Sequence, residues 1–159
     1  MKVNVLGCGN ILASDEGAGI HAVRKLNKFR FPDEVKVFEV GRPGTSILDF
    51  MLGAEILIII DAINKGNKPG SIIKYDSSSY ASLELFNFSI HGFNLIQAYE
   101  SGLKQYPERM PEEIMLYGIE VKERGKFRAE LSSPVKKAVN KLARELRKEI
   151  LLVYQKERT

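Results

Sequence analysis

Residues 55–63, which read EILIIIDAI, constrain the fold of this chain more than any other stretch. An unbroken apolar run, mostly β-branched, is the clearest strand in the sequence, and Asp61 stops it. A shorter apolar run over residues 3–6 ends at Gly7 and is typical of a buried strand in a parallel sheet. Further strands are expected over 35–40, over 71–76 at an edge of the sheet, and over 113–120.

Segments with helical spacing or helix-start signals lie between these strands. We expect one helix after Asp15, a short helix capped by Thr45 or Ser46, one over about 92–103, and one from Ser132 or Ser133 into the basic tail. Strands that alternate with helices predict an α/β fold, here a three-layer sandwich in which a twisted, mostly parallel sheet of about five strands has helices on both faces. Residues 1–159 are expected to form a single domain, since they contain no internal repeat and no linker.

Composition excludes several classes of protein. Hydrophobic residues make up 44% of the 159 and charged residues 28%, which is typical of a globular chain. No apolar run approaches the roughly 20 residues of a membrane span, so we expect no membrane insertion. Cys8 is the only cysteine, which excludes intramolecular disulfides and indicates the cytoplasm. The net charge of +4 gathers near the C-terminus, but KLARELRKEI has the spacing of a solvated helix face, and no nucleic-acid partner is predicted.

The opening loop, LGCGNILASDEGAGI, resembles a phosphate-binding turn but departs from one in several ways. Leu12 stands where a dinucleotide fingerprint requires its third glycine, and no Gly-Lys-Ser/Thr follows. Glu39, at the end of the second strand, is weak evidence for a ribose-binding acid. Asp15 and Glu16 would repel a pyrophosphate at a helix N-terminus, where an anion should be attracted. This loop therefore suits a cation better than an anion.

Three potential metal ligands fall in loops at the carboxyl edge of the predicted sheet, where α/β proteins bind ligands. Glu16 follows the first strand, Asp61 ends the third, and His91 stands before a helix. Two carboxylates and one imidazole suit a borderline divalent ion. Each residue also has a structural alternative. Glu16, like Asp15, can complement a helix dipole, Asp61 can cap a turn, and His91 can be an ordinary loop residue.

Other candidates for chemistry are weaker. His21 lies five residues after Glu16, about 140° round a helix, so we interpret it as a surface or packing residue. The sequence has no Gly-x-Ser-x-Gly elbow, and Cys8 has no identifiable histidine partner, so nucleophilic catalysis is not predicted. Cys8 is interpreted as a small packed residue.

Four segments together resemble the nickel–iron hydrogenase maturation endopeptidases. GCGNILASDEGAGIHAVRKL is similar to their N-terminal signature, and IIIDAINKGNKPGSII to their Asp-Ala loop. SIHGFNL resembles their Ser-x-His segment, and YGIEVKERGKFRAELSSPVKKAV their Gly-Ile-Glu strand with the helix that follows. The four segments occur in the same order and span nearly the whole chain.

The resemblance implies an endopeptidase that removes a C-terminal peptide from a hydrogenase large-subunit precursor after nickel insertion. Glu16, Asp61 and His91 would be its metal-sensing and catalytic residues. The nickel would arrive with the substrate and would not reside in the free protein, which is expected to be a monomer or a weak homo-oligomer. A bound metal would polarise the scissile carbonyl or activate water.

One loop departs from the family pattern, which often places an acid before Gly-Thr. Here EVGRPGTSILDF has Arg42 and Pro43 ahead of Gly44 and Thr45, and the nearest preceding carboxylate is Glu39. Either Glu39 serves as general base from a shifted position, or this chain uses no base there. Three alternatives to the protease are a metal-dependent chaperone that binds the large subunit without cutting it, a general metallohydrolase, and a small-molecule-binding domain.

Overall fold

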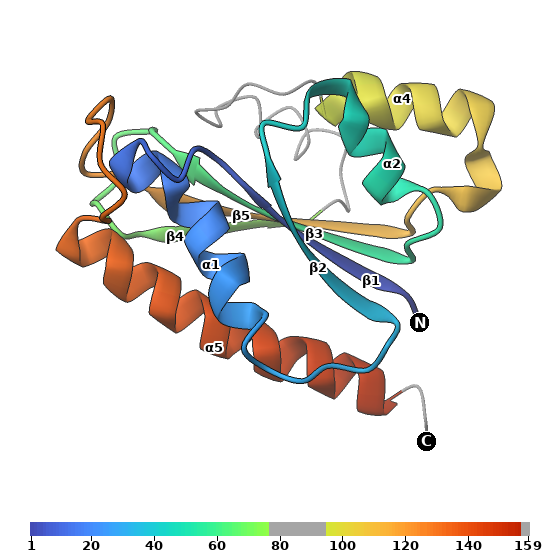
Figure 1. The fold of residues 1–159 in the computed structure, drawn as a ribbon. Coiled ribbons are helices and arrows are strands. Elements are labelled where there is room, and N and C mark those ends of the chain that lie inside the picture. Colours follow the sequence, from blue (N-terminus) through green and yellow to red (C-terminus); the bar gives the residue numbers. More distant parts are fainter. Residues whose placement is uncertain (77–94, 157–159) are drawn as a thin grey trace.

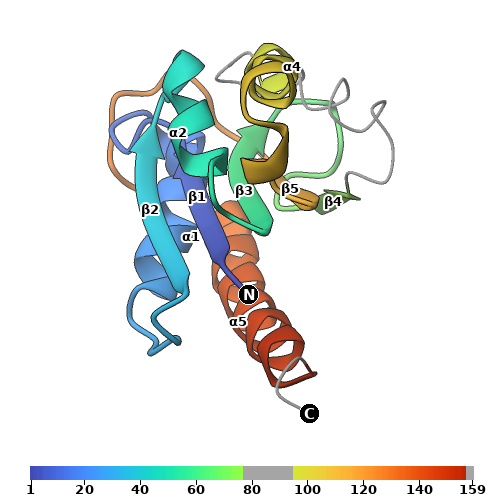
Figure 2. The ribbon, with the colours of Figure 1, turned by 90° about the vertical axis from the view of Figure 1, so that its right-hand side faces the viewer.

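The computed structural model describes residues 1–76 and 95–156 and has the predicted α/β architecture (Figure 1). One sheet is covered on both faces by helices, with α1 and α5 on one side and α2 and α4 on the other (Figures 1 and 2). The strands are β1 (Val3–Cys8), β2 (Val35–Gly41), β3 (Ile56–Ile63), β4 (Ile72–Asp76) and β5 (Glu113–Glu120). The helices are α1 (Ala18–Leu26), α2 (Ile47–Met51), α4 (Leu95–Gln105) and α5 (Ser133–Lys156), with short 3-10 turns η1 (Ser14–Gly17), η2 (Gly44–Ser46) and η4 (Pro107–Arg109).

The strands run in the order β2-β1-β3-β5-β4. The first four of these are parallel, and β4 pairs antiparallel with β5 at one edge of the sheet. The carboxyl ends of the parallel strands therefore meet at one side of the molecule, which is where ligands of such sheets bind.

The sheet separates two apolar cores. Every residue of β3 is buried, because helices cover both faces of this central strand. Ile58 and Ile60 pack with α1 and α5, whereas Leu57 and Ile59 pack with α2 and α4. Residues of α5 three and four positions apart bury one apolar stripe against the first core and expose the charged residues between them. The basic C-terminal segment is thus a solvated helix face, as predicted.

The predicted elements are confirmed, with small shifts at their ends. The strand predicted over 113–120 matches β5, and the strand predicted over 71–76 is the edge strand β4. The strand predicted to stop at Asp61 continues to Ile63, so Asp61 lies inside β3. The helix expected over about 92–103 is described from Leu95 to Gln105. Ser46 is the N-cap of α2, although its hydroxyl donates to the Pro43 carbonyl and not to the helix.

Candidate functional site

The opening loop is shaped by two glycines that let α1 lie directly on the sheet. A Cβ atom on Gly19 would overlap the carbonyl oxygens of Cys8 in β1 and Ile60 in β3. A Cβ on Gly7 would in turn overlap the Gly19 carbonyl oxygen and the Val23 side chain. The Gly-rich pattern therefore serves close packing of a helix on two strands. The start of α1 is consequently fixed over the carboxyl ends of β1 and β3.

Asp61 follows Ile60 directly and is fully buried. Its Oδ1 atom accepts a hydrogen bond from the Ala62 N–H at 2.8 Å. Because side chains alternate along a strand, Asp61 shares a face with Leu57 and Ile59, which belong to the α2 and α4 core. A carboxylate at this position lies at the strand ends on the side of the sheet that α4 covers.

Glu16 lies in the η1 turn, three residues before Gly19 and hence above the same strand ends. Its side chain is 12% exposed, and Oε1 lies 3.7 Å from Nε of Arg124 in the segment between β5 and α5. A carboxylate that reaches the surface at the sheet edge can accept a cation, and in the free protein a guanidinium lies beside it. The η1 turn packs against β3, which brings the segments of Glu16 and Asp61 together.

His91, the third predicted ligand, lies outside the described residues. Within residues 1–76 and 95–156, no group of three His, Cys, Asp or Glu side chains is close enough to hold a metal ion. The predicted trio therefore stays a prediction. Glu16 and Asp61 carry carboxylate oxygens, which divalent ions accept as ligands.

Asp15, the neighbour of Glu16, is a structural anchor. Its carboxylate is fully buried and accepts four hydrogen bonds. Three come from the backbone N–H groups of Lys122 (2.9 Å), Glu123 (2.8 Å) and Ser132 (2.7 Å), and the fourth comes from the Ser132 hydroxyl (2.7 Å). Sequence reasoning gave Asp15 only a helix-dipole role. The donors lie 107 to 117 residues away in the chain, so no local pattern indicated them.

Glu39, the possible general base, is paired with Arg24 of α1. Arg24 Nε lies 3.0 Å from Oε1 and Nη2 lies 3.0 Å from Oε2, so both carboxylate oxygens accept from one guanidinium. The pair raises the pKa of Arg24. Glu39 could act as a base only after this pair opens, and the pairing therefore argues for a structural role.

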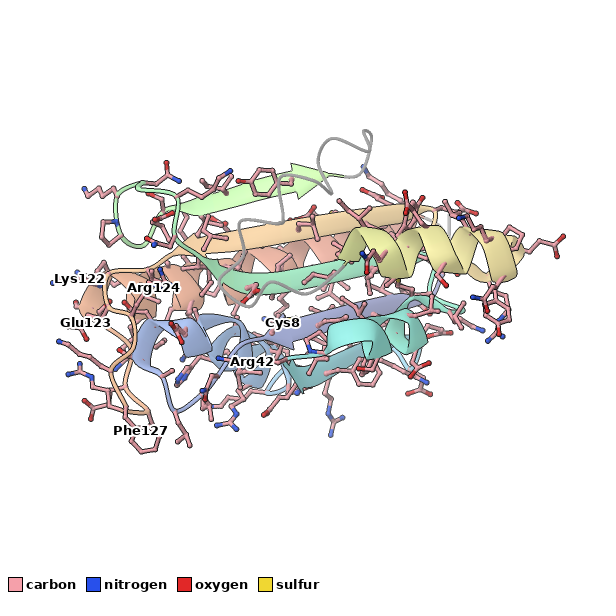
Figure 3. The ribbon with its side chains drawn as sticks, turned by 90° about the horizontal axis from the view of Figure 1, so that it is seen from above. Cys8, Arg42, Lys122, Glu123, Arg124 and Phe127 are labelled. Atoms are coloured by element: carbon pink, nitrogen blue, oxygen red, sulfur yellow. The ribbon has the colours of Figure 1, made fainter. Side chains whose placement is uncertain are left out.

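The Arg24–Glu39 pair lies in an open groove of about 540 Å³ between the opening loop and the end of β2. Arg42, which lines this groove and is labelled in Figure 3, is exposed and forms no ion pair with any carboxylate of the described residues. The groove is lined by Gly9, Asn10, Ile11, Ile20, Arg24, Glu39, Val40, Gly41 and Arg42. A cleft of this volume falls in the range in which proteins bind ligands.

Cys8 and His21 have the packing roles predicted for them. Cys8 is fully buried, and burial together with the nearby Asp61 carboxylate raises the pKa of its thiol, which keeps it protonated and unreactive. His21 Nε2 lies 3.2 Å from the Ala129 carbonyl oxygen, and partial burial lowers the pKa of the imidazole. Both residues hold structure near the site without facing a substrate.

Comparisons with known proteins agree with this fold. The model of the hydrogenase maturation protease family matches residues 20–149. The hydrogenase expression/formation protein HoxM of Azotobacter vinelandii is 32% identical over 139 residues, which cover 85% of this chain and 65% of HoxM. The hydrogenase maturating endopeptidase HybD from E. coli superposes with a TM-score of 0.76 at 26% identity over 94% of both chains. The [NiFe] hydrogenase maturation protease HybD from Thermococcus kodakarensis gives 0.76 at 29% identity, covering 94% of this chain and 99% of that one.

The α/β sheet, with a helix docked on it through the opening glycines, is thus the fold of the two HybD endopeptidases. The chain belongs to the hydrogenase maturation protease family. It spans slightly less than two thirds of the length of HoxM. None of the helices in the described part of the chain is long and apolar enough to cross a membrane.

Proposed function

We propose that the protein is an endopeptidase that removes the C-terminal extension of a nickel–iron hydrogenase large-subunit precursor once nickel has been inserted. The observation that carries the proposal is the close approach of Gly19 to Cys8 and Ile60, which supports it because the η1 turn of Glu16 then packs against β3, the strand of Asp61. Membership of the maturation protease family and the fold shared with the two HybD endopeptidases support the activity. A chain whose one cysteine is buried suits a reducing compartment, and we assign the reaction to the cytoplasm.

Glu16, Asp61 and His91 recognise the nickel that the precursor brings with it, so that a precursor without metal docks poorly. A nickel ion held in this way would polarise the scissile carbonyl or activate a water molecule. The groove beside Arg24 and Glu39 would hold the chain leading to the scissile bond, since it opens next to the loop that carries Glu16. Because both oxygens of Glu39 are paired with Arg24, we leave the general base unassigned among the described carboxylates.

The experiment is a processing assay in which the unprocessed large subunit, with and without nickel, is incubated with the protein and its C-terminal mass is followed. We expect cleavage only of the nickel-loaded form. Glu16→Gln, Asp61→Asn and His91→Ala should each lower kcat/KM by at least about 100-fold. Glu108→Gln is the matched control, because Glu108 lies in η4 before the start of β5. This variant should cleave the precursor like wild type.

Three results would count against the proposal. Equal cleavage of the nickel-free precursor would show that the nickel in the substrate plays no part in recognition. Tight binding of the precursor without any mass change would instead indicate a chaperone that does not cut. A stoichiometric metal ion retained by the purified protein, with cleavage independent of nickel in the substrate, would indicate a general metallohydrolase.

A further inference from the structure

The segment over residues 121–132, which we call the β5–α5 loop, is held at both ends by one carboxylate. Asp15 accepts hydrogen bonds from the backbone of Lys122 and Glu123 at the start of the loop and from Ser132 at its end. The η1 turn adds further bonds to the returning part. Ser14 donates from its N–H to the Arg128 carbonyl at 2.7 Å and from its hydroxyl to the Glu130 carbonyl at 3.1 Å. The loop is therefore fixed on the same turn that presents Glu16.

The middle of the loop projects from the molecule and carries a solvent-exposed aromatic ring, that of Phe127. Phe127 is 87% exposed, the most exposed of the large hydrophobic residues in the described ranges. Figure 3 shows it at the outer end of the loop, turned away from the body of the protein. A parallel bridge between Ala13 and Arg128 brings the segment of Leu12, itself 47% exposed, next to the segment of Phe127. Two exposed apolar residues thus lie on neighbouring segments.

The loop that carries Phe127 is rich in basic residues. Lys122, Arg124, Lys126 and Arg128 come from the loop, and Glu123 and Glu16 are the carboxylates with which the last three pair. Glu130 is a further carboxylate of the loop, so four cations stand against two acids of the loop and its net charge stays positive. The Arg124–Glu16 pair also connects the loop to the candidate site. An exposed aromatic on a rigidly held, basic loop has the features of an interface hot spot.

We propose that Phe127 and Leu12 form a docking surface for the body of the hydrogenase large-subunit precursor, at a hollow that is apolar in its centre and acidic at its rim. This assignment rests on the proposed function and specifies where the partner is held outside the reacting site. The position of the loop identifies the occupant, because Arg124 pairs with Glu16, so a protein held on this loop lies next to the candidate site. The net positive charge of the loop favours an acidic rim on that partner. Docking beside Glu16 would place the C-terminal extension of the precursor at the sheet edge.

The test compares Phe127→Ala with Leu152→Ala, which truncates another exposed apolar residue on α5, remote from the loop. The nickel-loaded precursor is the probe, and both its Kd and its cleavage kinetics are measured. We expect Phe127→Ala to raise Kd and KM at least tenfold, with kcat within twofold of wild type and an unchanged thermal melt. Phe127→Trp should restore binding. Raising salt should weaken wild-type binding, because the cations of the loop are screened.

The outcomes separate the docking surface from the proposed function. If wild type cleaves and Phe127→Ala binds as tightly as Leu152→Ala, the docking assignment is wrong and the protease stands. If Phe127→Ala lowers kcat with Kd unchanged, the residue acts at the reacting site and docking is again wrong. If wild type binds but never cleaves, the proposed function fails and the Kd values alone decide the surface. If wild type neither binds nor cleaves, both proposals fail.

Discussion

Asp15 and Glu16 are chemically alike and adjacent, yet the fold gives them opposite environments. Asp15 is fully buried and holds the backbone of a distant loop. Glu16 reaches the surface, where it lies beside Arg124, a residue far away in the sequence. The difference arises because η1 is a tight turn, so that successive side chains point in different directions.

Asp15→Asn tests the anchor. The amide places an NH₂ group where the Lys122 and Glu123 N–H groups and the Ser132 hydroxyl require an acceptor. Hydrogen bonds to a charged carboxylate are thereby replaced by donors that are partly unsatisfied. We expect the free energy of unfolding to fall by about 2–4 kcal/mol in urea titrations. Glu16→Gln is the control and should change it by less than about 1 kcal/mol. Equal losses in the two variants would contradict the anchoring role of Asp15.

His21 makes stability depend on pH in a predictable direction. Burial lowers the pKa of the imidazole, Arg24 and Lys25 lower it further, and the Ala129 carbonyl opposes them. The unfolded chain therefore binds this proton more readily than the folded one. The stability that the neutral His21 ring contributes is complete above the ordinary pKa of 6.5. It is lost as pH falls through the lower pKa of the folded state.

We expect the Tm of wild type to fall further between pH 7.5 and pH 5 than that of His21→Gln, by roughly 1–2 °C, because the ring is only half-buried. Glutamine retains an N–H for the Ala129 carbonyl and has no proton to gain in this range. Calorimetry at several pH values measures the difference. Parallel curves for the two proteins would show that His21 does not titrate with folding.

At the scale of elements, the contact of α1 with β1 and β3 determines where the site forms. Gly19→Ala adds a methyl group that meets two backbone carbonyl oxygens, which cannot turn aside as a side chain could. We expect a loss of more than about 3 kcal/mol on chemical denaturation, despite the better helix propensity of alanine. Gly66→Ala, at a positive φ of 80° with nothing within 4 Å of its Cβ, should lose only about 1 kcal/mol. A similar loss in both variants would mean that α1 can move away from the sheet.

The sequence predicted most elements because their signals are local. The apolar run of β3 and the Ser-Pro start of α5 each lie within a few residues. Glu16 and Asp61 were predicted as a pair because the carboxyl ends of parallel strands must meet. The η1 turn of Glu16 does pack against β3, and the role of the pair stays a prediction. The β5–α5 loop was not predicted, since it has no periodicity and its hydrogen-bond partners come from the other end of the chain.

At the scale of the whole molecule, one sheet separates two cores that share its strands. Leu142 of α5 belongs to one core, and Leu116 of β5 belongs to the other. We expect Leu142→Ala and Leu116→Ala each to cost about 2–5 kcal/mol, since both side chains are fully packed. Because β3 and β5 contribute to both cores, the unfolding transitions followed by near- and far-ultraviolet circular dichroism should shift together in either variant. Separate transitions would indicate that the two faces unfold independently.

The way the β5–α5 loop is fastened has an evolutionary consequence. Three of the four groups that grip Asp15 are main-chain amides, which every residue except proline provides. Residues 124–127 can therefore be exchanged, lengthened or shortened while the attachment points persist. A protein that evolves to bind a different partner can therefore change the sequence of these residues without loss of the hydrogen bonds that hold the loop.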